Sequence, residues 1–248
     1  MIILGDIGNS ETKICLLNTS NKIIKRLIFD TKSVNNFLLK KLFNNNYFKN
    51  KNITKILFCN VVPKSFNIVK IFLEKKYKVK CHELKNLKIS NLLKIKVDYK
   101  QIGSDRLANS ISVANKKDNF IILDFGTATT FDVLIKDVYH GGVIAPGLKI
   151  SLNTLIDKAT LIPNLNLKKT NKVIGINTLS AVRSGFFWGY IGLINSIVQL
   201  IQKETGKSFK IISTGGFSYL FKNSMGKKII INKDITIKGL IKASNLIR

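Results

Sequence analysis

Acidic residues are scarce in this chain. Only 14 Asp and Glu accompany 41 Lys and Arg, so the formal net charge is +27 over 248 residues. The lysines are spread along the chain with abundant Asn and Ile, residues that A/T-rich codons encode, and they form no basic arm. Nucleic-acid binding as the main role is therefore not favoured, although such a charge still attracts anionic substrates.

Cysteine and histidine are also rare. The three cysteines, Cys15, Cys59 and Cys81, lie in apolar segments without CxxC spacing. An odd number of such residues favours buried, reduced thiols in a cytoplasmic protein. The two histidines, His82 and His140, have no partner at metal-ligand spacing. A zinc site is therefore not expected.

Segments that mark export, membrane insertion and two common kinase folds are missing. The N-terminus has no basic stretch followed by an apolar one, and no unbroken apolar run approaches the roughly 20 residues that cross a bilayer. A GxxxxGK[ST] sequence is absent, and the letters DFG at 124–126 lack the Gly-rich loop, the lysine and the HRD context of protein kinases. We therefore expect no membrane segment, no P-loop and no protein-kinase site.

The two halves of the chain repeat one plan of α/β structure. Apolar patterns predict strands at 2–8, 12–18, 22–30, 55–62 and 78–84, with helices at 34–43, 66–75 and 104–116. The second half predicts strands at 120–125, 130–136, 139–144, 210–213 and 228–232, with helices at 149–157, 179–203 and 237–246. The repetition indicates internal duplication, with domains at 1–115 and 116–248.

Each half opens with a hairpin that carries an Asp and a Gly. These hairpins are "DIGNS", with Asp6 and Gly8, and "DFGTATT", with Asp124 and Gly126. Glycine lets the backbone turn sharply and approach a ligand, and the neighbouring hydroxyl side chains suit phosphate oxygens. Carboxylates repel phosphate, so a cation such as Mg²⁺ would stand between them. A single Asp-x-Gly is usually only a β-turn, but two at equivalent places favour phosphate binding. A third glycine pair, at 215–216 after a strand, suits a nucleotide base or sugar.

The segment "IGSDRLANSISVAN" contains the candidate catalytic group. Asp105 stands where a helix is predicted to begin, and such a residue is commonly an N-cap. Beside phosphate-binding hairpins, a carboxylate can also take the proton of an attacking hydroxyl. Arg106 can hold a substrate carboxylate or form a salt bridge.

Glycines mark two further segments. "GGVIAPG" at 141–147 fits a strand that opens into a rigid loop, lining a pocket or only making a turn. Gly185, Gly189 and Gly192 fall on one face of the predicted helix 179–203, which indicates close packing, including packing between subunits. Thr178, just before that helix, is either a ligand contact or a cap.

Six motifs in order resemble the type III pantothenate kinase family of the acetate-kinase, sugar-kinase, Hsp70 and actin superfamily. They are "DIGNS", "GSDR", "DFGTATTFD", "GGVIAPG", "TLSAVRSG" and "TGG". The resemblance implies two duplicated ribonuclease H-like domains with a central ATP cleft, in a homodimer whose interface helps to build the pantothenate pocket. It implies phosphorylation of pantothenate, the first committed step towards coenzyme A, with Mg²⁺ accompanying ATP and a monovalent cation, K⁺ or NH₄⁺.

The same resemblance assigns roles by position. Asp105 resembles the general base, Asp124 the monovalent-cation ligand, and Asp6 is a candidate Mg²⁺ ligand. ATP contacts are implied for Asp6, Gly8, Asn9, Ser10, Thr12, Lys13 and Thr127. Pantothenate contacts are implied for Tyr99, Gly103, Ser104, Asp105, Arg106 and Thr178. Ser10 replaces a usual Thr and keeps the hydroxyl, whereas Cys15 replaces a usual Gly in the second strand.

Two other functions stay open at this point. One is a kinase of another small hydroxy acid or sugar in the same superfamily, against which "GSDR" speaks. The other is a non-enzymatic regulator that binds DNA through its basic surface, although the sequence shows no helix-turn-helix pattern.

Overall fold

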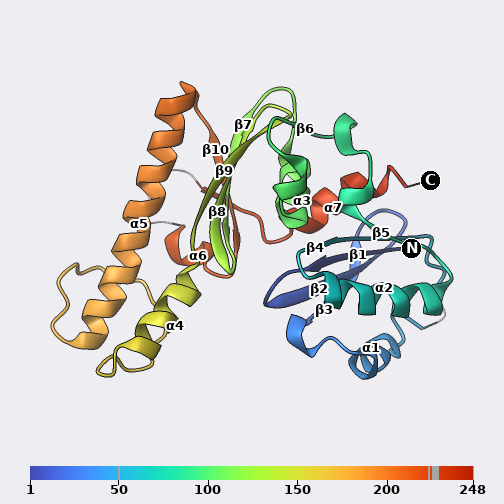
Figure 1. Ribbon diagram of the computed structural model, residues 1–248, viewed down its shortest axis with the longest axis horizontal. Coiled ribbons are helices and arrows are strands. Elements are labelled where there is room, and N and C mark those ends of the chain that lie inside the picture. Colours follow the sequence, from blue (N-terminus) through green and yellow to red (C-terminus); the bar gives the residue numbers. More distant parts are fainter. Residues whose placement is uncertain (50, 223, 225–228, 248) are drawn as a thin grey trace. The chain divides into compact units, whose positions relative to one another are not determined.

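The computed structural model describes residues 1–49, 51–222, 224 and 229–247 (Figure 1). The chain divides into two compact units. The first contains residues 1–114, 137–139 and the described residues from Asp234 onward; the second contains 115–136 and the described part of 140–233. The compact units differ from the expected domain limits, 1–115 and 116–248, at 137–139 and from Asp234 onward, and those domain limits stay a prediction.

The first unit is built on a five-stranded sheet in the order β3-β2-β1-β4-β5. Its strands are β1 (Ile2–Ile7), β2 (Glu11–Leu17), β3 (Ile23–Asp30), β4 (Lys55–Asn60) and β5 (Cys81–Glu83). The first three form the predicted antiparallel meander, and β4 and β5 add to it in parallel. The strand predicted over 78–84 begins later, because Lys78 has a left-handed φ of 57° where α2 ends.

Four helices complete this unit: α1 (Asn36–Phe43), α2 (Pro63–Tyr77), α3 (Ser104–Val113) and α7 (Ile235–Ser244). The last helix, α7, packs against α3 and against the central strands β1 and β4. The contact with α3 is close, since a Cβ atom on Gly239 would lie 1.8 Å from the backbone oxygen of Ala108. The end of the chain thus supports the helix that carries Asp105.

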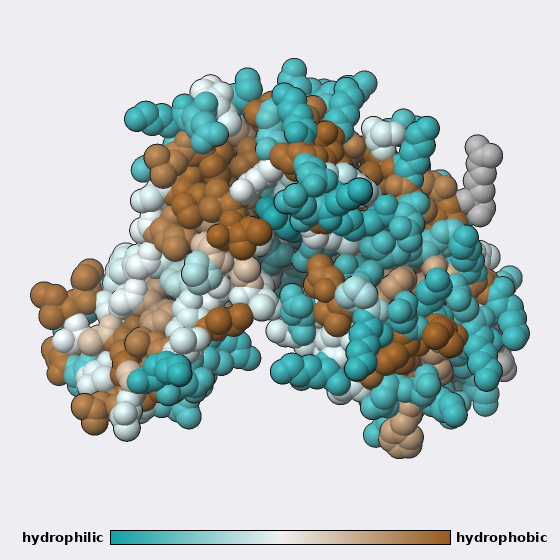
Figure 2. Space-filling model, viewed as in Figure 1, coloured by the Kyte–Doolittle hydropathy of each residue, from teal (hydrophilic) through white to brown (hydrophobic). Residues whose placement is uncertain are grey.

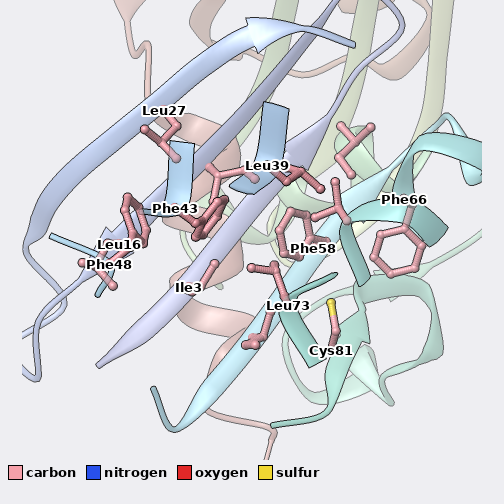
Figure 3. Packing of buried hydrophobic residues seen from close by; sticks show 14 of the residues in the cluster. Ile3, Leu16, Leu27, Leu39, Phe43, Phe48, Phe58, Phe66, Leu73 and Cys81 are labelled. Atoms are coloured by element: carbon pink, nitrogen blue, oxygen red, sulfur yellow. The ribbon is translucent and has the colours of Figure 1, made fainter. Parts of the chain in front are cut away.

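Apolar side chains from the sheet and from α1 and α2 form the core of the first unit. Figure 3 shows the ring of Phe58 on β4 between the labelled side chains of this cluster. Phe58 is fully buried, and it occupies the space that a side chain at Gly5 of the neighbouring strand would need. A Cβ atom on Gly5 would lie 1.9 Å from that ring, so the glycine before Asp6 is a packing requirement.

The second unit repeats the same strand plan. Its sheet runs β11-β10-β7-β8-β9 from β7 (Asn119–Phe125), β8 (Ala128–Ile135), β9 (Val138–Pro146), β10 (Lys210–Gly215) and β11 (Ile229–Ile231). The start of β9, which belongs to the first unit, pairs with β6 (Lys94–Ile95). Order and direction match the first sheet, with β7–β8 antiparallel and β10 and β11 added in parallel. The predicted duplication is confirmed. Lys228, the first residue of the strand predicted over 228–232, lies outside the described residues.

Three helices belong to the second unit: α4 (Leu148–Lys158), α5 (Thr178–Thr205) and α6 (Ser218–Phe221). The long helix α5 buries Phe187 and Tyr190, whose rings stack near Phe221 of α6. In the described chain, α5 is the one helix that length and composition would allow to span a membrane. This is weak evidence, because the same residues include the buried core face of the helix.

Candidate active site

Hydrogen bonds to backbone groups stabilise the turn between β1 and β2. Gly8 N donates to Glu11 O at 3.0 Å, and Thr31 Oγ1 donates to Gly8 O at 2.7 Å. Thr12 is fully buried, and its hydroxyl lies 2.9 Å from that of Thr31. The predicted ATP contact of Thr12 stays a prediction, and the geometry directs its hydroxyl to the interior of the hairpin.

Three other predicted ATP-binding residues have side chains at or near the tip of this turn. Asn9 and Ser10 are exposed there, where their side chains and backbone can meet a ligand. Lys13 is partly buried and stands directly opposite Asp6 in the antiparallel register. Its positive charge lowers the pKa of Asp6.

Asp6 lies among groups that make its ionised form costly. Burial raises the pKa of Asp6 from 3.8 to about 6, and the negative charge of Asp105 contributes to the rise. Cys59, the register partner of Asp6 on β4, donates its thiol proton to Asp6 Oδ1 with an S–O distance of 3.4 Å. A cation beside Asp6 would offset the burial and the repulsion, which fits the candidate role of Mg²⁺ ligand.

Asp105 stands in the first turn of α3 but does not cap it. The N-cap is Gly103, and Asp105 Oδ1 accepts a hydrogen bond from Arg106 N at 2.8 Å. A Cβ atom on Gly103 would lie 2.5 Å from the same oxygen, so glycine leaves room for this carboxylate. Burial raises the pKa of Asp105, and the backbone bond and charge of Arg106 oppose the rise. The N-cap alternative for Asp105 is therefore wrong.

The remaining acceptor-binding candidates in the first unit surround Asp105 in sequence. Tyr99 is partly buried and donates its hydroxyl to Lys85 O at 3.0 Å. Ser104 is almost fully buried, and its hydroxyl donates to Glu83 Oε1 at 3.0 Å. Glu83 was not singled out by the sequence, because nothing in its local pattern points to a residue twenty-one positions away.

In the second unit, Asp124 is flanked by hydroxyl-bearing residues. It stands opposite Thr130 of β8 and Thr214 of β10 in the sheet register. Directly paired residues point to the same face of a sheet, so one carboxylate and two hydroxyl oxygens share that face. Oxygen donors of this kind suit hard cations, and the role of Asp124 as monovalent-cation ligand stays a prediction.

The turn of the second Asp-Gly hairpin packs against the other two glycine motifs. Thr127 is exposed at its tip, as expected for a phosphate contact. A Cβ atom on Gly147 would lie 1.9 Å from Thr127 O, and one on Gly215 would lie 2.5 Å from Phe125 O. Gly215 also has a φ of 84°, which favours glycine. The structure thus brings "DFGTATT", "GGVIAPG" and "TGG" together.

Thr178 is the first residue of α5 and is exposed. The cap is Asn177, whose Oδ1 accepts from Ser180 N at 2.9 Å in a capping box. The cap alternative for Thr178 is therefore wrong, and its side chain is available to a ligand. Asp6 and Asp105 belong to one unit, whereas Asp124, Thr127 and Thr178 belong to the other. The shared ATP cleft stays a prediction.

Within the described part of the chain, His, Cys, Asp and Glu side chains form no group of three that could hold a metal ion. Mg²⁺ commonly binds through one or two carboxylates together with substrate phosphates and water. One carboxylate, such as that of Asp6, is compatible with this mode of binding, and the role of Asp6 as a Mg²⁺ ligand stays a prediction.

The fold is that of solved kinases of the sugar-kinase and actin-like group. A Sinorhizobium meliloti protein described as a 2-dehydro-3-deoxygalactonokinase superposes with a TM-score of 0.65 at 9% identity, covering 100% of this chain and 99% of that one. A Baf family protein from Campylobacter jejuni gives 0.63 at 20% identity, covering 97% and 96%. At these identities the likeness defines the fold alone, and it confirms the predicted fold class.

The sequence comparisons are more specific. The type III pantothenate kinase family model matches residues 2–200. The type III pantothenate kinase of Pelagibacter ubique (strain HTCC1062) is 69% identical over 248 residues, which cover the whole of both chains. The chain belongs to the type III pantothenate kinase family.

Proposed function

We propose that this chain transfers the γ-phosphoryl group of ATP to the primary hydroxyl of (R)-pantothenate, giving 4'-phosphopantothenate in the first step of coenzyme A biosynthesis. The observation that carries the proposal is the 69% identity to a type III pantothenate kinase over the full length of both chains. The geometry of Asp105 at the start of α3 supports it. The rival kinase activities, on another hydroxy acid or a sugar, have no comparable match among the sequence relatives described above.

In this proposal Asp105 is the general base. Burial raises the pKa of its carboxyl, which makes the carboxylate a better proton acceptor than an exposed one. The backbone N–H of Arg106 fixes one carboxylate oxygen, and the carboxylate would accept the proton of the substrate hydroxyl. Proton transfer from pantothenate to Asp105 would accompany attack of the hydroxyl oxygen on the γ-phosphorus, and ADP would leave.

The hairpins hold the nucleotide. Asn9, Ser10 and Lys13 would contact the phosphates from one unit and Thr127 from the other, with Gly8 allowing the backbone to come close. Mg²⁺, when bound with ATP beside Asp6, supplies positive charge to the phosphate oxygens. Catalysis would then consist mainly of positioning and charge stabilisation.

Asp124 would hold the monovalent cation, K⁺ or NH₄⁺, together with the hydroxyls of Thr130 and Thr214. Such an ion adds positive charge beside the nucleotide-binding hairpin without a divalent site. Replacement of K⁺ and NH₄⁺ by Na⁺ in the assay is therefore expected to collapse activity.

Tyr99, Gly103, Ser104, Arg106 and Thr178 are proposed to form the pantothenate site. Arg106 suits the carboxylate of pantothenate, since a guanidinium binds a carboxylate through two parallel hydrogen bonds. Gly103 and Ser104 would act mainly through the backbone, because the Ser104 side chain is buried against Glu83.

We also propose that the protein acts in the cytoplasm as a homodimer through α5. Gly185, Gly189 and Gly192 form an exposed stripe on this helix, and no described atom outside the helix lies within 4 Å of a Cβ built at any of them. The preceding loop exposes Leu161, Ile174 and Ile176 by 84–90%. Figure 2 shows brown, apolar side chains over α5 and this loop. A second copy would cover such a surface.

A coupled kinase assay with ATP and pantothenate, with and without K⁺, tests the proposal directly. Substitution Asp105→Asn should reduce kcat by about three orders of magnitude while the protein stays folded, because the amide cannot accept the proton. A panel of small hydroxy acids and sugars in the same assay separates the rival kinase activities. Near-normal turnover by Asp105→Asn would remove Asp105 from its role.

A further inference from the structure

Glu83 ends strand β5 and reaches the first turn of α3. Its Oε1 accepts a hydrogen bond from the Ser104 hydroxyl at 3.0 Å, and Ser104 is 1% exposed. We propose that Glu83 is a positioning residue for the phosphoryl-transfer site: it fixes the stretch Tyr99–Arg106 and thereby the carboxylate of Asp105. The inference rests on the proposed function.

The start of α3 depends on this contact because its ordinary cap is missing. Gly103 occupies the N-cap position, and no side chain in the described chain makes the cap hydrogen bond there. Asp105 turns its carboxylate onto Arg106 N and does not reach back to the cap. The bond between Ser104 and Glu83 is therefore the side-chain tie that fixes where the helix begins, and a carboxylate near this end also suits the helix dipole.

Glu83 is itself held firmly. It pairs in parallel with Phe58 of β4, a fully buried residue of the sheet core. The next strand position after Phe58 is Cys59, which contacts Asp6. Glu83 therefore connects the edge strand β5 to α3. This connection keeps Asp105 in place with respect to the first hairpin.

A second observation places Glu83 beside the other end of the same stretch. Its negative charge, after burial, contributes to the raised pKa of Tyr99. Tyr99 is in turn fixed by its hydrogen bond to Lys85 O, two residues beyond Glu83. Segment 83–85 therefore touches both ends of the acceptor-binding stretch.

The consequence concerns turnover more than folding. Loss of the tie would let the first turn of α3 shift, and a displacement of about 1 Å of a catalytic group costs on the order of a hundredfold in rate. The hairpin that binds ATP is not part of the tie. We expect Glu83→Ala and Ser104→Ala each to lower kcat by about ten- to a hundredfold, with KM for ATP unchanged within about twofold.

The experiment is steady-state kinetics on the full chain for wild type, Glu83→Ala, Glu83→Gln, Ser104→Ala and the double alanine variant. Glu83→Gln keeps an oxygen that accepts the Ser104 hydroxyl and should restore most of kcat. The double variant should lose no more than either single one, since both remove the same bond. Glu74→Ala is the matched control, because Glu74 Oε1 accepts from Cys81 N at 2.8 Å at the start of the same strand.

Three results would overturn the inference: wild-type kcat in Glu83→Ala and Ser104→Ala, additive losses in the double variant, or an equal loss of kcat in Glu74→Ala. If Glu83→Ala fails to fold, Ser104→Ala still decides, because it removes the same hydrogen bond with a smaller change. Failure of the proposed function is a separate outcome, in which the wild-type chain does not phosphorylate pantothenate. In that case the inference falls with it.

Discussion

The negative charge of Asp105 on α3 acts on Asp6 on β1: burial, followed by this charge, raises the pKa of Asp6 to about 6. Two acidic groups brought together in a partly buried place oppose folding unless a cation or a substrate offsets them. These carboxylates therefore lower the stability of the first unit at the proposed catalytic site.

The burial of Asp6 and its repulsion by Asp105 together predict a stabilising substitution. In the folded chain Asp6 has a pKa of about 6, above the 3.8 expected when it is unfolded. The folded state binds the proton more tightly, so the penalty is fully present above pH 6 and disappears as the pH falls towards 3.8. Asp6→Asn should raise the free energy of unfolding at pH 8 by about 1–3 kcal/mol while abolishing activity.

Thermal or urea unfolding in metal-free buffer at pH 8 and pH 4.5 measures this effect. The difference between wild type and Asp6→Asn should shrink at the lower pH. Glu204→Gln, at an exposed position of α5 whose charge does not contribute to the pKa of Asp6, serves as the control. A gain in stability that is equal at both pH values would contradict the electrostatic account.

A second prediction concerns the thiol beside Asp6. Cys59 donates to Asp6 Oδ1, so Cys59→Ala should leave that carboxylate less well oriented and raise KM for ATP about three- to tenfold. Cys59→Ser should recover most of the loss, because a hydroxyl also donates. The measurement is the dependence of rate on ATP concentration at saturating Mg²⁺.

Cys81→Ala is the matched control for this thiol. Cys81 is also buried in the first unit, but it lies in β5 opposite Ile56, and Figure 3 shows it within the apolar cluster. Cys81→Ala should change the free energy of unfolding more than it changes KM for ATP. Equal KM effects at both cysteines would show that Cys59 acts only through packing.

The contact between α7 and α3 predicts a large effect of one methyl group. Gly239→Ala would place a Cβ atom 1.8 Å from Ala108 O, and backbone on both sides leaves little room to move. We expect a loss of more than about 2 kcal/mol in unfolding free energy and a fall in kcat through displacement of α3. Denaturant unfolding and kinetics check both.

Gly216→Ala offers a comparison for that substitution, since no described atom lies within 4 Å of its Cβ position. Its unfolding free energy should change by less than about 1 kcal/mol. A comparable loss of unfolding free energy in the two variants would mean that replacing either glycine lowers stability. It would contradict a specific role for the contact between α7 and α3.

The proposed dimer predicts that one bulky charge on α5 separates the subunits. Gly189→Arg adds a long cation in the centre of the exposed glycine stripe, so the molar mass in solution should fall to that of a single chain. Light scattering after gel filtration measures it. Ile71→Arg is the control, because Ile71 is an exposed residue of α2 in the first unit. This variant should keep the wild-type mass. A single-chain mass for wild type would end the dimer proposal.

Much of the fold was predictable because hydrophobic periodicity and turn residues are local. The meander at the start of each half, α3 and α5 all follow their predicted positions to within a few residues. The short elements β6 and α6 were not predicted, and two further differences arise where a single backbone angle or cap decides. Lys78 turns left-handed and shortens β5, and Asn177, not Thr178, caps α5.

In the candidate site, too, the local motifs were predictable from the sequence and the contacts between distant residues were not. The Asp-Gly hairpins and "GSDR" are visible as motifs, and the roles assigned to their residues stay predictions. Cys59 and Glu83 gave no functional signal, because their partners Asp6 and Ser104 are distant in sequence. Cys59 meets Asp6 through strand pairing, and Glu83 meets Ser104 where β5 ends beside α3. Register between parallel strands cannot be derived from local pattern alone.

The last helix gives the molecule an order of assembly. Because α7 packs against α3, β1 and β4 but follows them in the chain, α3 is synthesised before the helix that supports it. The helix that carries Asp105 is therefore expected to reach its final packing only after Gly239 has been synthesised.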